Sequence, residues 1–230
     1  MANFSAVHRD PSTEYFEHQL RQSVPDHIGQ FVDGEPLVYH ELVSDHMHID
    51  VFCWAPTAQR NMWTMATVGM AAHKMRTSPG HEYYQHAELV ITLPADWPSL
   101  DKVQAMPRSK AHQYFWPIRA MKEVARLPYL HDTWVGIGHT TQAGRGRRDT
   151  FRGSHFSGML VAPIHSMPEQ AMTLEVEGSD IRLYGLYPLY AEELQFVLDQ
   201  PYRGKTHELY HRFISAGLHE GIFPQRERLA

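Results

Sequence analysis

The sequence predicts a single α+β domain. Segments with the apolar spacing of helices occur between segments rich in β-branched and aromatic residues, which is typical of mixed helix and strand content. The chain has 230 residues, of which 43% are apolar, so it can bury a full core. It carries no internal repeat and no composition shift that would mark a linker. We therefore expect one domain over residues 1–230, with a core at about 37–216.

The first helix is expected over about residues 12–24. Tyr15, Phe16 and Leu20 form an apolar stripe there, and Pro25 is expected to end the helix. Two more helices are expected near the C-terminus, over 191–199 and 206–216. Thr206 would cap the last helix and Gly217 would end it. Residues 223–230 are expected to form a loosely held tail.

The clearest helical signal lies in the middle of the chain. Trp116-Pro117 suits a helix start, and Pro128 is expected to stop the helix after Leu127. Its apolar positions recur at helical spacing, whereas its charged positions fall mainly on the opposite, solvent side. The apolar positions are Ile118, Met121, Val124, Ala125 and Leu127; the charged ones are Arg119, Lys122, Glu123 and Arg126.

The expected strands are short runs rich in β-branched and aromatic residues, bounded by turn residues. They are expected at 37–43, 46–56, 62–68, 87–97, 133–135, from 156 and from 181. The segment from Met62 could also form a helix, because methionine and alanine favour one, but Thr64, Thr67 and Val68 favour a strand through Val68. The polar segment before Ser109 is expected to be a loop. A second loop, from Gln142 to Ser154, holds several glycines and arginines.

Composition excludes several classes of function. The formal net charge is −5, which favours neither a nucleic-acid binder nor a membrane-surface protein. No apolar run reaches the ~18–20 residues of a membrane span, and the N-terminus does not resemble a signal peptide, so we expect a cytoplasmic protein. Cys53 is the only cysteine, which excludes an intramolecular disulfide and a thiolate zinc cluster.

The string HELYH at 207–211 fits the HExxH zinc pattern. On a helix, His207 and His211 share one face and could bind Zn²⁺, while Glu208 would activate a water for a hydrolase. However, with 17 histidines in the chain the pattern carries a substantial risk of a chance match, and the usual downstream third ligand is absent because Gly217 stands where a metzincin has histidine. A zinc hydrolase therefore remains an alternative function.

A second candidate metal set is His46, His48 and Asp50, which alternate along an expected strand. Alternate residues of a strand lie about 6.6–6.8 Å apart on one face, so neighbouring pairs could approach one ion. The competing interpretation is that Asp50 hydrogen-bonds a neighbouring strand or histidine, as half-buried carboxylates usually do. We expect no cofactor, and His46, His48 and Asp50 stand as candidate metal ligands beside His207 and His211.

The glycine- and arginine-rich loop suggests a third alternative, a small-anion binder. Arg145, Arg147 and His139 would hold the anion, helped by backbone N–H groups of the glycines. Neither GIGHTT nor GRGRRD matches a phosphate-binding motif, and such loops are usually solvated turns.

The order of several strings resembles the suppressor-of-fused (SUFU) domain family. They are HIDVFCWAPT, TVGMA, ELVITLPADW, WPIRAMKEVARLPYLHDTWVGIGHTT, FSGMLVAPI and IRLYGLYPLYAEEL. The most specific part is the central W-P-x(3)-M-x(3)-A-R helix that leads to T-W-x(3)-G-H.

This resemblance implies an α+β domain with a mixed β-sheet flanked by helices, and a binding role without catalysis. It implies the single-domain bacterial type, whose members are proposed as immunity proteins that bind and neutralise toxins. The expected partner is thus another protein, such as a toxin, and the sequence identifies no oligomeric state. The binding surface would include Leu127, Trp134, Gly138, His139 and Thr140, with Gly138 where the family has an acidic residue.

Overall fold

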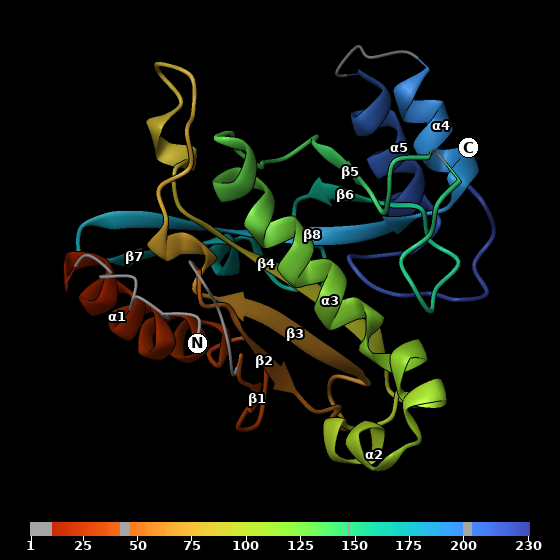
Figure 1. The fold of residues 1–230 in the computed structure, drawn as a ribbon, viewed down its shortest axis with the longest axis horizontal. Helices are drawn as coiled ribbons and strands as arrows, with labels where there is room; N and C mark the ends of the chain where they lie inside the picture. Colours follow the sequence, from red (N-terminus) through yellow and green to blue (C-terminus); the bar gives the residue numbers. More distant parts are fainter. Residues whose placement is uncertain (1–10, 42–46, 147, 200–203) are drawn as a thin grey trace, which may run out of the picture.

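A mixed β-sheet runs through the molecule, with helices on both of its faces (Figure 1). The computed structural model describes residues 11–41, 47–146, 148–199 and 204–230. In this part of the chain, eight strands lie in the order β1-β2-β3-β4-β8-β6-β5, and β7 also pairs with β8. The β4–β8 pair is parallel and the other pairs are antiparallel. The expected α+β fold with a mixed sheet and flanking helices is therefore confirmed.

The strands are β1 (Leu37–Tyr39), β2 (Asp50–Trp54), β3 (Met62–Val68), β4 (Ala87–Pro94), β5 (Thr140–Gln142), β6 (Gly158–Ala162), β7 (Thr173–Val176) and β8 (Ser179–Leu189). The helices are α1 (Pro11–Ile28), α2 (Leu100–Ala105), α3 (Arg108–His131), α4 (Ala191–Leu198) and α5 (Gly204–Ser215). Short 3₁₀ turns occur at η1 (Met70–Ala72), η2 (Glu82–Tyr84) and η3 (Glu169–Met172).

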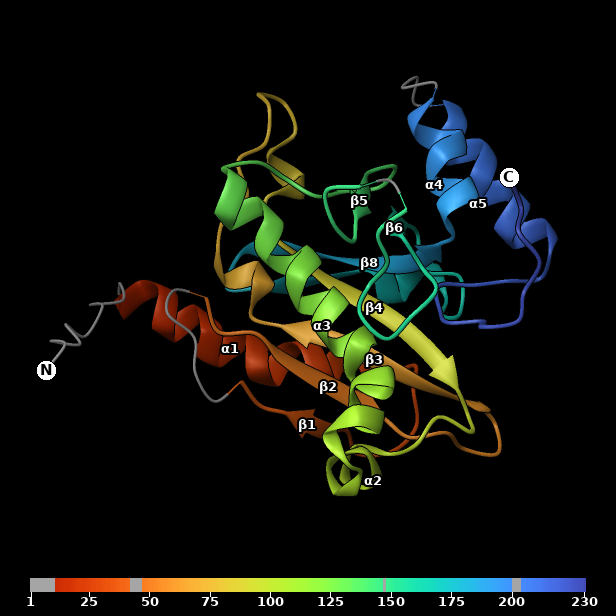
Figure 2. The same ribbon diagram turned by 45° about the vertical axis from the view of Figure 1, so that its right-hand side comes forward.

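Helix α3 covers one face of the sheet and crosses it obliquely (Figure 2). Its buried Met121 and Ala125 belong to the same core cluster as the alternate residues Val51 and Cys53 of β2. Trp116 extends this core by stacking on Phe151, with ring centroids 6.0 Å apart. Most of the fixed positions of the W-P-x(3)-M-x(3)-A-R pattern are thus core residues.

The opposite face of the sheet is covered by α1 at one end and by α4 and α5 at the other. Leu20, Val24 and Ile28 of α1 pack with the alternate residues of β2, β3 and β8. Leu209 and Phe213 of α5 pack on β6 and β8. Because successive strand residues point to opposite faces, every central strand is buried on both sides.

Pro25 and Pro128 were expected to end their helices, but neither does. Helix α1 continues through Pro25 to Ile28, and α3 continues through Pro128 to His131. A proline removes one helical hydrogen bond, but its φ of about −65° suits a helix, and continuing α1 buries Ile28 completely. Helix α3 ends instead at Asp132, whose φ of 48° is left-handed.

Several boundaries and elements differ from the sequence predictions. The expected loop before Ser109 contains α2, where Val103 is buried, and α3 already begins at Arg108. The expected strand at 133–135 is irregular, and the strand starts only after the glycines, at Thr140. Strands β1, β2 and β4 are shorter than expected, although residues 42–46 lie outside the described part. Strand β3 occupies the expected residues 62–68.

The hairpin of β7 and β8 was not predicted. Val176 pairs with Ser179 across a two-residue turn formed by Glu177 and Gly178. Both turn residues have positive φ, 49° and 74°, as a type I′ turn requires. The Glu-Gly pair between two β-favouring runs was the sequence signal for this hairpin.

The charged side of α3 is only partly exposed to solvent, whereas the sequence predicts a fully solvent-facing side. Lys122 is buried, its Nζ lies 3.6 Å from Glu41 Oε1, and it also lies over the Tyr39 ring. Arg126 Nη2 donates to both Glu41 carboxylate oxygens, at 2.5 and 2.6 Å. The arginine of the family pattern therefore ties α3 to the segment that follows β1.

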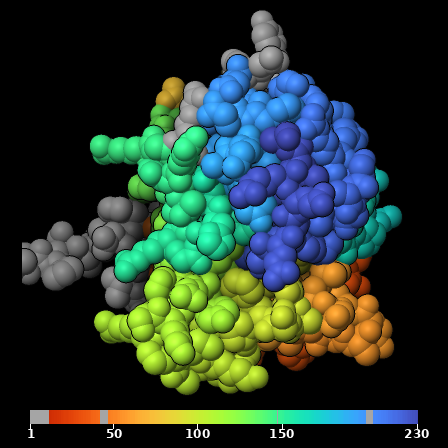
Figure 3. All heavy atoms as spheres, turned by 90° about the vertical axis from the view of Figure 1, so that its right-hand side faces the viewer, coloured from red at the N-terminus to blue at the C-terminus, as the bar shows by residue number. Residues whose placement is uncertain are grey.

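The C-terminal residues are not a loose tail. Arg226 donates from Nη2 to Glu193 Oε2 at 2.6 Å and to Pro188 O at 2.9 Å. The Leu229 N–H donates to Glu193 Oε1 at 2.9 Å. This segment lies against α4 and α5, dark blue on lighter blue in Figure 3. Before it, Gly221 forms a parallel bridge with Thr92 beside the end of β4.

Candidate functional site: an aromatic pocket beside a sheet edge

A pocket of about 460 Å³ opens where four parts of the chain meet. We call it the aromatic pocket, because its walls carry four histidines, three tyrosines and a tryptophan. The walls come from the turn at 81–84, the segment 134–139, β6 with its exit, and α5. The lining residues are His81, Tyr83, Tyr84, Trp134, Ile137, Gly138, His139, Leu160, Val161, Ala162, Pro163, Thr206, His207, Tyr210 and His211.

Trp134 is the centre of the aromatic wall. It stacks on Tyr84 with ring centroids 5.5 Å apart, and the ring of His139 meets it edge-on at 4.4 Å. The centroid of the Tyr84 ring in turn lies 4.0 Å from that of the Tyr83 ring. These ring contacts hold the 81–84 turn against the segment 134–139 that follows α3.

The glycines of the central string shape this wall. A Cβ at Gly136 would lie 2.7 Å from a ring carbon of Trp134, so only glycine lets the indole pack on the backbone. Gly138 has a φ of 87°, and its N–H donates to Val161 O at 2.8 Å. Val161 N–H donates back to His139 O at 2.9 Å, which fixes the turn onto β6.

The structure brings most of the predicted binding residues together. Trp134, Gly138 and His139 line the aromatic pocket, and Thr140 begins the adjacent strand β5. Leu127 does not line the pocket; it is partly buried and packs on the core beneath α3.

Sequence reasoning did not identify the wall formed by His81, Tyr83 and Tyr84, nor Tyr210 of α5. The aromatic-rich string HEYYQH at 81–86 was the available signal. Two rim residues are large apolar side chains exposed to solvent: Tyr83 is 47% exposed and Ile137 is 51% exposed. Exposed apolar groups around a cavity are typical of interaction sites.

Next to the pocket, β5 forms one edge of the sheet. In the described part of the chain β5 pairs only with β6. Val161 N–H donates to His139 O and Ala143 N–H donates to Ser157 O, so residues 139, 141 and 143 face β6 with their backbone groups. The N–H and C=O groups of Thr140 and Gln142 consequently point to the open edge.

The HELYH string lies on α5, as predicted, but its two histidines and its glutamate make different contacts. His207 and His211 line the aromatic pocket, with their Nε2 atoms 3.0 Å apart. Glu208 instead binds Lys205 at 2.9 Å and Arg212 at 2.6 Å, and these hydrogen bonds lower the pKa of its carboxyl. Over the described residues, no three metal-ligating side chains lie close enough to share an ion. The arrangement gives no support to a HExxH hydrolase.

In the second candidate metal set, Asp50 is a structural acceptor. His48 Nε2 lies 2.9 Å from its Oδ1, His40 Nδ1 lies 3.3 Å from its Oδ2, and the Glu41 N–H donates at 2.9 Å. Burial raises the pKa of Asp50, but the Glu41 N–H and the histidines outweigh burial and leave it below the ordinary value. The hydrogen-bonding interpretation is thus confirmed for His48 and Asp50, whereas His46 lies outside the described residues.

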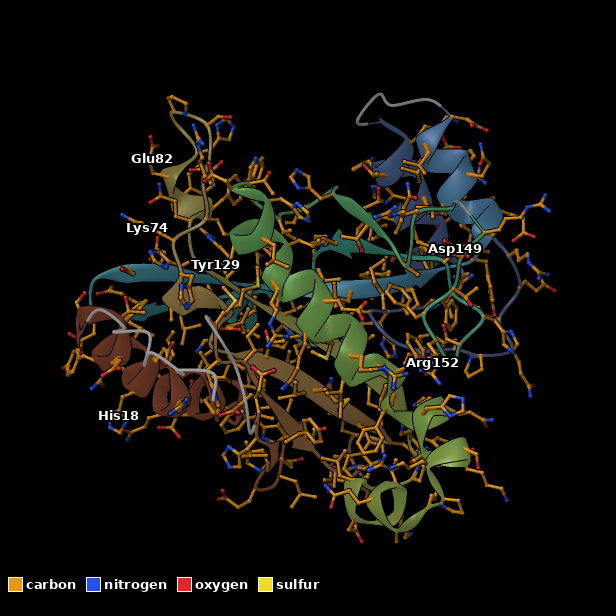
Figure 4. All side chains as sticks on the ribbon, in the orientation of Figure 1. His18, Lys74, Glu82, Tyr129, Asp149 and Arg152 are labelled. Carbon is orange, nitrogen blue, oxygen red and sulfur yellow. The ribbon has the colours of Figure 1, made fainter. Side chains whose placement is uncertain are left out.

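The arginine loop does not present an open anion cradle. Gly146 N–H donates to Asp149 Oδ2 at 2.8 Å, so the chain's own carboxylate occupies the glycine turn. Asp149 and Arg152 lie on this loop in Figure 4. Arg145 is exposed and does not line the pocket that contains His139, and Arg147 lies outside the described residues.

Comparison with known proteins identifies the family. The family model described as Suppressor of fused protein (SUFU) matches residues 45–226. The chain belongs to the SUFU family. No curated protein sequence matches this SUFU-family chain.

Solved SUFU structures share the fold. A SUFU homologue from Neisseria gonorrhoeae matches with a TM-score of 0.63 and 14% identity, over 93% of this chain and 98% of that chain. A chain of the Sufu–Fu complex matches with a TM-score of 0.59 and 15% identity, over 92% of both chains. Drosophila Suppressor of Fused matches with a TM-score of 0.58 and 16% identity, over 92% of this chain but 51% of the fly chain. Across the described residues, no helix has the length and apolar character needed to cross a membrane.

Proposed function

We propose that this SUFU-family chain is a protein-binding module without a chemical step of its own. An extended segment of the partner adds to the edge of β5 and places one large apolar side chain in the aromatic pocket. The observation that carries the proposal is the position of that pocket, directly beside the outward backbone groups of Thr140 and Gln142.

The sheet edge supplies affinity that does not depend on the partner's sequence. Adding a strand pairs the outward N–H and C=O groups of Thr140 and Gln142 with the partner's backbone. The described part of β5 has only three residues, so the edge offers few hydrogen bonds. Tight binding therefore requires a second contribution.

The aromatic pocket supplies that contribution and the selectivity. Its 460 Å³ is in the range of ligand pockets, and its walls are aromatic rings with apolar residues of β6. Aromatic residues in desolvated pockets typically dominate binding energy, and the exposed Tyr83 and Ile137 would be covered by a partner.

The relatives support a binding role. One of the matched structures is a complex in which Sufu binds another protein, Fu. We further propose that the partner of this chain is a toxin protein, that the chain acts as an immunity protein, and that it works in the cytoplasm. These finer proposals rest on the resemblance to single-domain bacterial members.

Affinity capture from the native cell, with the partner quantified by mass spectrometry, tests the proposal. Gln142→Pro removes one outward N–H, whereas the matched Gln142→Ala changes the same side chain and keeps that donor. We expect near-stoichiometric capture by the wild type and by Gln142→Ala, and at least tenfold less by Gln142→Pro and by Trp134→Ala. Equal capture by all four proteins, or no stoichiometric partner under any growth condition, would contradict the proposal.

A further inference from the structure

The two histidines of the HELYH string converge on one point at the pocket wall. His207 and His211 are four residues apart on α5, so their side chains share one helical face. Their rings meet at 70° with centroids 4.2 Å apart, and their Nε2 atoms share a hydrogen bond of 3.0 Å, whose proton must leave Nε2 when an ion binds both nitrogens. Both side chains are exposed and line the aromatic pocket, so an ion can reach them from solvent.

We propose that His207 and His211 form a two-imidazole chelate for a divalent transition metal, with a preference for Cu²⁺ and Ni²⁺ over Zn²⁺. The proposal does not depend on the proposed protein-binding function, because it rests on the two histidines and their surroundings and not on the sheet edge.

The distance between the nitrogens fits a tetragonal metal site. With metal–nitrogen bonds of about 2.0–2.1 Å, nitrogens 3.0 Å apart subtend about 90–100° at the ion. That is the angle between neighbouring ligands in tetragonal Cu²⁺ or Ni²⁺ sites. Tetrahedral Zn²⁺ needs nitrogens about 3.3 Å apart, so the pair must open slightly to bind zinc.

The chemistry around the pair agrees with this choice. Among the described residues no carboxylate lines the pocket, so hard cations that prefer carboxylate oxygens find no such ligand there. Lys205 and Arg212, two cations on the same helix, are paired with Glu208 and lie over the Phe196 ring at 4.3 and 4.6 Å. Neither cation lines the pocket, so neither stands between solvent and the pair.

The remaining coordination positions are open to water or to a side chain of a bound partner. Lys205 and Arg212 hold Glu208, so this carboxylate is not free to act as the general base of a HExxH hydrolase. The proposed site is therefore a metal-binding site and not the HExxH catalytic centre.

Calorimetric titration of the untagged protein with CuCl₂, NiCl₂ and ZnCl₂, in a buffer that does not bind metals, tests the proposal. We expect one tight equivalent of Cu²⁺, followed in affinity by Ni²⁺ and then Zn²⁺. His207→Gln and His211→Gln should each weaken it at least tenfold. His18→Gln, which removes a single exposed histidine from the outer side of α1 (Figure 4), should leave it unchanged.

A reconstruction of the chelate serves as a positive control. In the His207→Gln/His211→Gln background, Glu14→His places a second imidazole four residues before His18, with both positions exposed on α1. One tight equivalent should return. The proposal would be overturned if the wild type bound Cu²⁺ no more tightly than the His207→Gln/His211→Gln variant, whether both bind tightly or both bind weakly.

Paramagnetic broadening locates the ion independently. Cu²⁺ at half an equivalent should broaden the NMR signals of the Tyr210 ring, whose centroid lies 5.7 Å from that of the His211 ring. The ring signals of Tyr15 on α1 should not be broadened. Broadening of Tyr15 with Tyr210 unaffected would place the ion elsewhere and contradict the proposal.

Discussion

The imidazole ring of His139 meets the indole of Trp134 edge to face, with ring centroids 4.4 Å apart. This contact joins the aromatic wall of the pocket to the residue that precedes β5. A change that moves Trp134 should therefore alter both the pocket and the sheet edge beside it.

Gly136→Ala is expected to displace Trp134, because the added Cβ would lie 2.7 Å from its ring. We predict a changed emission spectrum for Trp134 and at least tenfold weaker partner binding. The change can be assigned by comparison with the same substitution in a Trp134→Phe background. Gly204→Ala is the matched control, since nothing lies within 4 Å of a Cβ there. An unchanged spectrum in Gly136→Ala would contradict this account of the pocket wall.

Arg226 should anchor the C-terminal segment strongly. It is paired with Glu193, which is fully buried, and its guanidinium lies 4.6 Å from the Tyr190 ring and 4.7 Å from the Phe213 ring. Arg226→Ala leaves the Glu193 charge uncompensated, so we expect the free energy of unfolding to fall by about 3–5 kcal/mol. Urea denaturation measures it. Adding Glu193→Gln should recover part of the loss; a single-variant loss below about 1 kcal/mol would contradict the prediction.

Glu88 should make stability depend on pH. Burial raises the pKa of its carboxyl from 4.5 to about 7, although Thr67, Ala71 and Gly69 donate to it. A raised pKa in the folded state contributes stability below about pH 4.5, and that stability is lost as pH rises through about 7. At 1.36 kcal/mol per unit, the full loss is about 3 kcal/mol.

Glu88→Gln keeps a neutral side chain at every pH and so isolates this effect. The unfolding free energy of the wild type, measured relative to Glu88→Gln, should fall by most of about 3 kcal/mol between pH 5 and pH 8. The difference cancels the titration of the many histidines. A difference that does not vary with pH would show that Glu88 does not titrate in this range.

Cys53 should be inert in the folded protein. It is buried in β2, and burial raises the pKa of its thiol to about 12. Because the thiolate is the reactive form, iodoacetamide at pH 8 should modify the native protein at least 100-fold more slowly than the urea-unfolded protein. Mass spectrometry over time gives both rates, and comparable rates would contradict the predicted burial.

The sequence predicted those elements in which the spacing of the apolar residues matches the face that is buried. Strand β3 and the start of α4 were located well, because Met62–Val68 and Ala191–Leu198 carry their signals locally. The ends of α1 and α3 were not, since burial of Ile28 and the left-handed Asp132 are consequences of tertiary packing. Local rules for proline gave the wrong boundary at both helices.

The candidate site was predicted only in part, for a similar reason. Trp134, Gly138 and His139 lie in one string, so the resemblance could indicate them together. The remaining walls come from 81–84 and from α5, which only the folded sheet brings beside that string. Likewise, Glu41 and Arg126 are 85 residues apart, and no spacing rule predicts their contact.

Amide hydrogen exchange in the free protein and in its partner complex tests the central claim most directly. The outward N–H groups of Thr140 and Gln142 should exchange rapidly in the free protein and at least tenfold more slowly in the complex. The N–H of Thr141, which faces β6, should change less. If Thr140 and Gln142 exchange equally in both states while the opposite sheet edge at Leu37–Tyr39 gains protection, the partner binds at β1, and the proposed site is wrong.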